Sequence, residues 1–284
     1  MFVQPASLSA AIDLLARHGG KLLAGGTDFF PALGQAAITT PIIDISRLAE
    51  LRTIGIAGET IRLGAAVTWS EMVAAPLPAG FDALKAAARE IGSIQIQNRG
   101  TLGGNLCNAS PAADSLPPLL TLDARIELAS PRGTRDMPLA QFIRGNRQTG
   151  LAHDEIMTAI LVPRRNGDLT SHFAKLGARR YLVISIAMVA VALHRAADGG
   201  IEDARIAIGS CSAVATRLPE LEAALTGCQS ARGIARRVTA EHLVRLAPID
   251  DVRATAAYRR DAALTLIRRA VRDCFAQTPV MGHR

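Results

Sequence analysis

Two short stretches decide how this sequence is interpreted: KLLAGGTDFFPAL at residues 21–33 and QNRGTLGGNLCN at residues 97–108. Each contains two adjacent glycines close to a threonine, and each follows residues typical of a strand or an extended chain. Glycine has no side chain, so main-chain N–H groups in such a segment can approach a diphosphate closely. The hydroxyls of Thr27 and Thr101 can add hydrogen bonds to it. We therefore predict two diphosphate-binding loops, at residues 24–28 and 101–105.

A simpler interpretation stays open for each glycine pair, because glycine is a default residue of tight turns. Two such clusters, each with a threonine, favour a shared ligand over two unrelated turns. Neither cluster matches the patterns G-x-G-x-x-G or G-x-x-x-x-G-K-[ST]. A Rossmann dinucleotide fold and a P-loop nucleotide hydrolase therefore lose their main support.

The composition favours a folded protein over a disordered one. The chain has 284 residues, 49% of them hydrophobic, which predicts a sizeable core and two or three domains. Its formal net charge of +7 suits a nucleic acid, a dinucleotide or an acidic partner subunit. The longest apolar stretch, residues 181–193, is shorter than the roughly 20 residues of a membrane helix. We expect a soluble cytoplasmic protein without membrane insertion.

The arginines near the C-terminus are the main argument for nucleic acid. They alternate with Ala, Leu and Ile at helical spacing, which favours a solvated helical face instead. These arginines are Arg259, Arg260, Arg268, Arg269 and Arg272. We expect no nucleic-acid partner.

The cysteines and histidines form no metal-binding pattern. Cys107, Cys211, Cys228 and Cys274 are far apart in the sequence, and the six histidines show neither HxH nor HExxH spacing. We therefore predict free thiols and no bound metal. Cys107 lies beside the second glycine cluster, but a single small thiol there is more often a packing residue, so we assign it no redox role.

The hydrophobic periodicity and turn residues predict the secondary structure. Strands are expected at residues 21–24, 41–45, 52–56, 60–64, 125–129, 155–162, 171–175, 183–194 and 201–208. Helices are expected at residues 8–18 after the N-cap Ser7, from Asp28 to just before Pro31, and at 69–74, 81–91, 114–122, 218–225, 235–246 and 258–275. Residues 163–168 are polar and rich in turn formers, so we place a domain boundary there.

Four ordered segments resemble the FAD-binding (medium) subunits of the xanthine dehydrogenase and carbon monoxide dehydrogenase family of molybdenum hydroxylases. They are KLLAGGTDFFPAL (21–33), IQNRGTLGGNLCNASPAADSLPPLL (96–120), FAKLGARR (173–180) and PIDDVRATAAYRRDAALTLIRRAV (248–271). The resemblance implies an α+β fold in two domains. Residues 1–165 would form a two-part FAD-binding domain of the vanillyl-alcohol-oxidase (PCMH-like) type, with subdomains at about 1–53 and 54–165. Residues 169–284 would form a three-stranded antiparallel sheet with a helical layer.

The resemblance also implies a function. Such a chain is an oxidoreductase subunit that binds FAD non-covalently and takes electrons from a 2Fe-2S small subunit. It passes them to an external acceptor such as NAD, oxygen or a quinone. The molybdopterin cofactor would lie on a large partner subunit, where the substrate is hydroxylated.

By resemblance, the cofactor contacts fall on the two glycine clusters, their flanking residues and three single positions. They are Leu22, Leu23, Ala24, Gly25, Gly26, Thr27, Asp28, Phe29, Ile91, Thr101, Leu102, Gly103, Gly104, Asn105, Asp114 and Lys175. The resemblance assigns no catalytic acid, base or nucleophile to this chain.

The three single positions carry different expectations. Asp114 would contact the FAD, since a carboxylate can accept hydrogen bonds from ribose or ribityl hydroxyls, although it also suits a helix N-cap. Lys175 would reach the flavin side, where its ammonium offsets negative charge, unless it is a solvated lysine at a strand edge. Ile91 falls where xanthine dehydrogenases place an aromatic residue against the flavin ring. A second departure from those enzymes is residues 181–183, which replace an acidic stretch.

Two other function classes remain open. A stand-alone flavin oxidoreductase of the same fold would be reduced by its own substrate, but the sequence shows no obvious acid/base pair for this. A non-catalytic module that binds a flavin, a nucleotide or a nucleic acid is the second alternative. Reduction of the bound flavin through a 2Fe-2S partner distinguishes both alternatives from an electron-transfer subunit.

Overall fold

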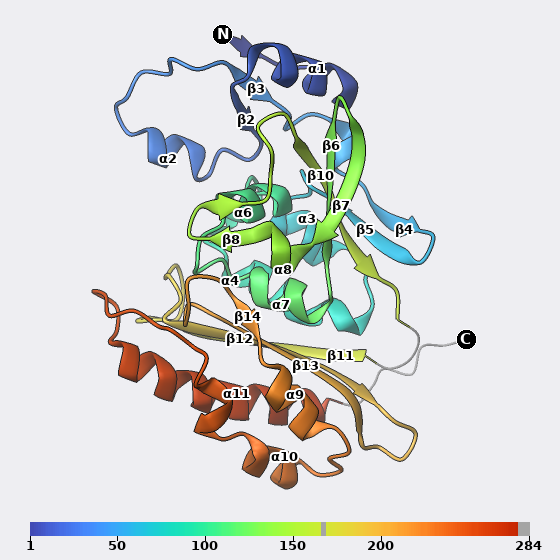
Figure 1. Ribbon diagram of the computed structural model, residues 1–284, viewed down its shortest axis with the longest axis vertical. Coiled ribbons are helices and arrows are strands. Elements are labelled where there is room, and N and C mark those ends of the chain that lie inside the picture. Colours follow the sequence, from blue (N-terminus) through green and yellow to red (C-terminus); the bar gives the residue numbers. More distant parts are fainter. Residues whose placement is uncertain (166–168, 278–284) are drawn as a thin grey trace. The chain divides into compact units, whose positions relative to one another are not determined.

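The computed structural model describes residues 1–165 and 169–277, which fold into two compact units (Figure 1). Unit 1 comprises Met1–Ala75, Ser93–Ala109 and Asp123–Arg164, and unit 2 comprises Pro76–Gly92, Ser110–Leu122 and the chain from Arg165 onward. The chain therefore passes from one unit to the other several times. Of the predicted linker at residues 163–168, the last three lie outside the described residues. The expected domain limits stay a prediction.

A small parallel sheet forms the N-terminal part of unit 1. Its strands, in the order β1-β3-β2, are β1 (Phe2–Val3), β3 (Ile42–Asp44) and β2 (Lys21–Leu23). Helix α1 (Leu8–His18) begins at the predicted N-cap, where the Ser7 hydroxyl accepts a hydrogen bond from the Ala10 amide. The helix buries Ala11 and Leu15 against Ile43, so its apolar face anchors the sheet.

An antiparallel sheet of five strands forms the rest of unit 1, in the order β4-β5-β10-β6-β7. The strands are β4 (Ile54–Ala57), β5 (Thr60–Gly64), β10 (Ile156–Pro163), β6 (Arg125–Ser130) and β7 (Gly133–Pro138). Strand β7 was not predicted, because it lies at the sheet edge and its first four residues are exposed, so it shows no apolar alternation. The short pair β8 (Ile143–Gly145) and β9 (Gln148–Thr149) was missed as well.

The helical segments of unit 1 are short. They are α2 (Phe29–Leu33), the 3-10 turn η1 (Ala49–Leu51), α3 (Trp69–Ala74), α5 (Ile94–Gln97), α6 (Leu102–Asn108) and α8 (Leu139–Phe142). Helix α2 continues through Pro31, contrary to our prediction, because a proline in the first helical turn sacrifices no hydrogen bond.

The predicted loop at residues 101–105 is instead the start of a helix, because the second glycine cluster forms the first turn of α6. The Thr101 hydroxyl caps this helix by accepting a hydrogen bond from the Gly104 amide at 3.1 Å. Two glycines lower the helix propensity of a seven-residue segment strongly. The cap and the packing of the first turn stabilise a helix that propensity alone does not indicate.

Unit 2 is built on an antiparallel sheet in the order β11-β12-β13-β14. The strands are β11 (Leu169–Leu176), β12 (Ala187–Arg195), β13 (Ile201–Gly209) and β14 (Thr216–Arg217). The first three were predicted, and β14 is a two-residue edge strand too short to give a periodic signal. Strand β12 begins four residues later than predicted, because residues 181–185 form a loop and the preceding apolar run is not part of the ladder.

Both faces of this sheet are covered (Figure 1). One face packs against α11 (Ala256–Ala276). Val189 and Val191 of β12 and Ile267 of α11 belong to the same buried hydrophobic cluster. The other face packs against α4 (Asp82–Glu90), where Met188 and Ala190 meet Ala87. Two buried faces explain why β12 is a continuous apolar run without alternation.

The remaining helical segments of unit 2 are η2 (Ala79–Phe81), α7 (Leu116–Thr121), α9 (Pro219–Leu225), α10 (Ala231–Arg237) and η3 (Ala240–Leu243). The predicted helix at 235–246 is wrong, since Val238 adopts an extended conformation and Thr239 starts a separate turn. Within residues 1–165 and 169–277, no helix combines the length and apolar character needed to cross a membrane.

Thr68 connects α3 to the second glycine cluster, and this contact is testable. Its hydroxyl accepts from the Glu71 amide in a capping box, and its backbone forms an isolated bridge with Thr101. Thr68→Ala should lower the free energy of unfolding by about 1 kcal/mol, because one orphan N–H of α3 loses its acceptor. Chemical denaturation measures the loss, and Thr68→Ser, which keeps the hydroxyl, should recover most of it. Equal stability of all three proteins would contradict the capping role.

Candidate cofactor site

The first glycine cluster follows β2 and leads into α2, as a strand, tight turn and helix. Gly26 has φ +77°, a backbone conformation that side chains disfavour. A Cβ atom at position 25 would lie 2.0 Å from the carbonyl oxygen of Arg99. Glycine at position 25 is therefore required so that the turn can pack against the backbone that precedes α6.

The two clusters adjoin each other within unit 1, as the shared-ligand prediction requires. A Cβ atom at Gly100, one residue before Thr101, would lie 3.3 Å from Thr27 Oγ1 and 3.3 Å from a ring carbon of Trp69. The Trp69 amide also donates to the Gly100 carbonyl at 3.2 Å. About 75 residues of sequence separate these two turns, and the fold brings them into contact.

The amides of the second cluster already have acceptors. The Leu102 amide donates to Val67 O at 2.9 Å, and the Gly103 amide donates to Ala65 O at 2.8 Å. A Cβ atom at Gly103 would lie 2.7 Å from the Ala65 Cβ, so this glycine allows α6 to pack on the chain after β5. We expected amides from both clusters to converge on a diphosphate. The amides of Leu102 and Gly103 cannot contribute, because they already donate to protein carbonyls.

Gly104 lies on the outer side of the same turn. It is exposed, and a Cβ atom there would approach only the Thr101 hydroxyl, at 2.8 Å. A ligand can therefore reach the main chain at Gly104 but not at Gly103. Asn105 is half-buried one residue further along α6.

The amides of the first cluster have a different environment. Within residues 1–165 and 169–277, the amides of Gly25, Gly26 and Thr27 donate no hydrogen bond to a protein acceptor. Partly buried N–H groups without a protein partner need water or a ligand. Three consecutive donors on a glycine turn make a concave anion site. This turn therefore fits a diphosphate, and the second cluster forms its wall.

The residues that flank the first cluster mainly support it. Leu22 and Ala24 pack against the core cluster around Ile43, and Leu23 is buried. Asp28 is exposed and precedes α2 without a side-chain cap. Phe29 is half-buried and packs edge-to-face on Phe30, with ring centroids 5.3 Å apart.

Unit 2 contains the other charged residues that the sequence predicted. Lys175 on β11 donates to Asp114 Oδ2 at 2.6 Å, and their side chains are 8% and 7% exposed. Burial raises the pKa of Asp114, whereas the Lys175 ammonium and the Ser185 hydroxyl act in the opposite direction. The solvated-lysine alternative is wrong, because Lys175 is buried in an ion pair. The N-cap alternative for Asp114 is also wrong, since Ser115 occupies the N-cap position of α7.

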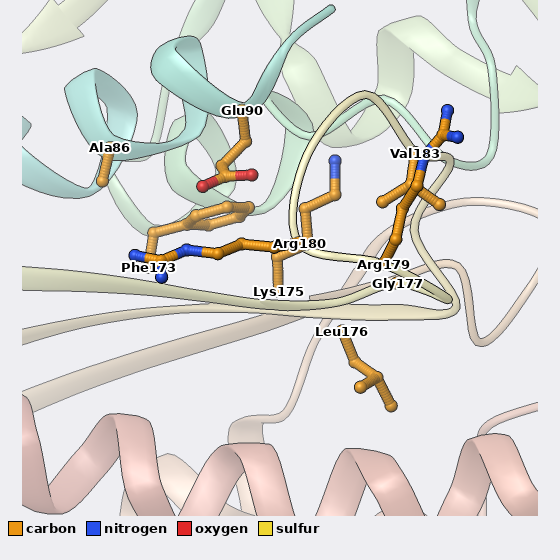
Figure 2. Close-up of a pocket in the computed structure, with 9 residues that line it drawn as sticks. All are labelled: Ala86, Glu90, Phe173, Lys175, Leu176, Gly177, Arg179, Arg180 and Val183. Carbon is orange, nitrogen blue, oxygen red and sulfur yellow. The ribbon is translucent and has the colours of Figure 1, made fainter.

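A pocket of about 420 Å³ lies beside Lys175 in unit 2 (Figure 2). Glu90 and Ala86 of α4 face it from one side, and Phe173 of β11 faces them from the other. Arg179 and Arg180, in the loop after β11, complete its charged lining. The Arg179 guanidinium donates to Leu182 O at 2.5 Å and so fixes the conformation of this loop.

Sequence reasoning named Ile91 but missed Ser185 and Phe173. Ile91, the predicted flavin neighbour, ends α4 as a half-buried C-cap directly after Glu90. Ser185 was read as part of a strand, although a single hydroxyl within an apolar run was a signal of a buried polar contact. Phe173 gave no separate signal, since it reads as an ordinary core residue of β11.

The described residues 1–165 and 169–277 contain no group of three or more His, Cys, Asp or Glu side chains placed to hold a metal ion. The four cysteines are free thiols, and Cys211, Cys228 and Cys274 are buried. Burial raises the pKa of the Cys274 thiol to about 12 and that of Cys211 to about 11. These two thiols are therefore unreactive packing groups at neutral pH.

Comparisons with known proteins agree with this geometry along nearly the whole chain. Residues 1–165 match the family described as the FAD binding domain in molybdopterin dehydrogenase. Residues 172–274 match the CO dehydrogenase flavoprotein C-terminal domain. The mixed α/β fold is thus that of a known flavoprotein, with both of its domains present.

Relatives and solved structures give the same result. The nicotine 6-hydroxylase medium subunit of Paenarthrobacter nicotinovorans is 34% identical, and the match covers 98% of each chain. The xanthine dehydrogenase FAD-binding subunit of Escherichia coli O157:H7 is 33% identical over 95% of this chain and 94% of that one. Carbon monoxide dehydrogenase from Hydrogenophaga pseudoflava superposes with a TM-score of 0.87 at 30% identity, over 97% of this chain and 96% of that chain. The chain therefore belongs to the family of FAD-binding medium subunits of molybdopterin dehydrogenases.

Proposed function

We propose that this chain binds FAD non-covalently as the electron-transferring flavoprotein subunit of a heteromeric molybdenum hydroxylase. It is an oxidoreductase subunit that takes electrons from a 2Fe-2S partner and passes them to an external acceptor. The observation that carries this proposal is the first glycine turn, whose three amides donate to no acceptor in the described part of the chain and which packs against the second glycine cluster. Bound FAD supplies the capacity to collect single electrons and release them as a pair.

The residues of unit 1 fit the diphosphate part of the cofactor. The amides of Gly25, Gly26 and Thr27 would donate to the phosphate oxygens without a lysine, as glycine-rich anion sites do. Thr101 holds the first turn of α6 in place, and the exposed Gly104 leaves room beside it. This division of roles supports the two-part FAD domain of the vanillyl-alcohol-oxidase type, for which unit 1 supplies a small parallel and a larger antiparallel sheet.

The residues of unit 2 fit the flavin part. Asp114 is an acceptor for ribose or ribityl hydroxyls, because each carboxylate oxygen has more than one lone pair. The Lys175 ammonium can offset negative charge that develops when a flavin is reduced. At Ile91, aliphatic packing would replace the aromatic contact expected for xanthine dehydrogenases, which would alter the flavin environment.

The relatives support a proposal for the partners and the location of this chain. Relatives of nearly the same length are named medium subunits or medium chains, so we propose a 2Fe-2S small subunit and a molybdopterin-binding large subunit as partners. An acidic partner surface would suit the net charge of +7. We propose a cytoplasmic complex, and its acceptor is NAD, oxygen or a quinone.

The nucleic-acid alternative is weakened by what the arginines of α11 do. Arg259 is 3% exposed and forms an ion pair with Asp251 at 2.7 Å, so our expectation that it belongs to a solvated helical face is wrong. Arg260 donates to Leu246 O and Arg268 to Val238 O, both within unit 2. Three of the five arginines therefore stabilise the fold of unit 2. A helix that binds nucleic acid presents its cations to the ligand instead.

Purification of the native complex tests the proposed function directly. We expect three co-purifying chains and a visible spectrum with flavin and 2Fe-2S bands, both bleached when the substrate of the molybdenum subunit is added anaerobically. A stand-alone oxidoreductase would be a single yellow chain reduced by its own substrate. A colourless monomer would refute both readings.

Gly104→Val tests the role of the second cluster in the assembled complex. The Cβ of a valine would press on the Thr101 hydroxyl, at 2.8 Å, and its branches would enter the space outside the first turn of α6. Flavin per complex should therefore fall at least tenfold, a loss of about 1.4 kcal/mol in binding. Flavin is released by denaturation and measured by its absorbance. The matched control is Gly55→Val on β4, where a Cβ atom meets nothing within 4 Å. Full flavin content in Gly104→Val, with the complex assembled, would exclude this glycine from the site.

A further inference from the structure

Both oxygens of the Asp114 carboxylate are engaged within unit 2. Oδ2 accepts from the Lys175 ammonium at 2.6 Å, and Oδ1 accepts from the Ser185 hydroxyl at 2.5 Å. Ser185 is 2% exposed and lies two residues before β12. A serine hydroxyl has one proton to donate, so this bond uses its whole donor capacity. The fold has placed a buried hydroxyl against the second oxygen of a buried carboxylate.

The backbone beside Ser185 is fixed from two directions. The Ile186 amide donates to Leu176 O at 2.7 Å, which ties it to the end of β11. The Ile186 carbonyl accepts from Arg259 Nη1 at 2.6 Å. The backbone that carries Ser185 is therefore held in place beside Asp114.

Arg259 joins three parts of unit 2 through one buried guanidinium. Nη1 donates to Ile186 O and also to Ser210 O, at 3.1 Å, just after β13, and Nη2 pairs with Asp251 at 2.7 Å. A planar guanidinium with several fixed donors can hold such a junction, whereas a lysine ammonium cannot match its geometry. The helix α11 thus anchors the start of β12.

The charges around Asp114 are balanced on several sides. Lys175 of β11 pairs with it, Glu90 of α4 acts on it as a like charge, and Arg179 and Arg180 of the following loop line the pocket next to Lys175. When Asp114 is ionised, it neutralises the ammonium of Lys175. When Asp114 is protonated, a net positive charge remains at this position.

We propose that Ser185, held by Arg259, is a positioning residue that keeps the Asp114 carboxylate ionised and oriented toward Lys175. The inference rests on the proposed function, in which Asp114 and Lys175 lie on the flavin side. It concerns residues that the family resemblance does not assign. The physical reason is that a buried carboxylate favours the protonated state when one of its oxygens accepts no hydrogen bond. The Ser185 hydroxyl supplies that hydrogen bond.

Loss of the hydroxyl should change the flavin electrostatically. In Ser185→Ala, Oδ1 loses its donor, so the pKa of Asp114 rises above its wild-type value. At pH values between the Asp114 pKa of wild type and that of the variant, Asp114 is protonated only in the variant. The Lys175 ammonium is then not neutralised, and the variant carries one more positive charge beside the flavin than wild type does. Positive charge favours the reduced, more negative flavin, so the midpoint potential should rise in that pH window. At higher pH, where Asp114 is ionised in both proteins, the difference should vanish.

The experiment measures the flavin midpoint potential by reductive titration of the purified holo-complex from pH 5 to pH 9. Ser185→Ala should show a higher potential than wild type in the pH window between the Asp114 pKa of wild type and that of the variant, with the two curves meeting above that window. Ser185→Thr keeps the hydroxyl and should follow the wild-type curve. Ser171→Ala is the matched control, because Ser171 is equally buried on the same sheet but bonds to Ala79 O and the Ala83 amide.

The outcomes separate this inference from the proposed function. A wild-type complex without flavin would refute the function itself. Flavin-loaded Ser185→Ala with a wild-type potential at every pH, or Ser171→Ala with an equal shift, would overturn the positioning role and leave the function intact. A pH-dependent rise confined to Ser185→Ala would support it.

Discussion

The close approach of Gly25 to the Arg99 carbonyl is the constraint on which the candidate site depends. Any side chain at position 25 would collide with that oxygen, at 2.0 Å from its Cβ. Because glycine allows this contact, the turn after β2 lies against the chain that leads into α6. Its own amides donate to no acceptor among the described residues. The capping of α6 by Thr101 and its packing on Ala65 then fix the second wall. Backbone geometry, without any charged side chain, creates this part of the site.

Unit 2 contributes a different kind of interaction. A buried carboxylate is costly unless it is paired and hydrogen-bonded, and Asp114 meets both conditions through Lys175 and Ser185. Such pairs are weak evidence for stability, but they fix charge and orientation at one place. We interpret the ion pair between Asp114 and Lys175 as a functional feature. Its two residues come from separated segments, and Lys175 lines a pocket with further charged residues.

The local parts of this structure could be predicted from the sequence, and the long-range parts could not. Ser7, the apolar run of β12 and the two glycine clusters each gave a signal within a few residues. The contact between residues 25 and 99, the pairing of Asp114 with Lys175 and the junction at Arg259 depend on tertiary packing, which a single sequence does not encode in any short pattern. Local signals also misled where packing overrode them, as in α6, whose glycines indicated a loop.

The decisive experiment is a structure of the FAD-loaded complex, determined by electron cryo-microscopy or crystallography. We expect diphosphate oxygens about 3 Å from the main-chain nitrogens of Gly25, Gly26 or Thr27, a normal hydrogen-bond distance. A diphosphate bound elsewhere, with those three nitrogens facing only solvent, would contradict it.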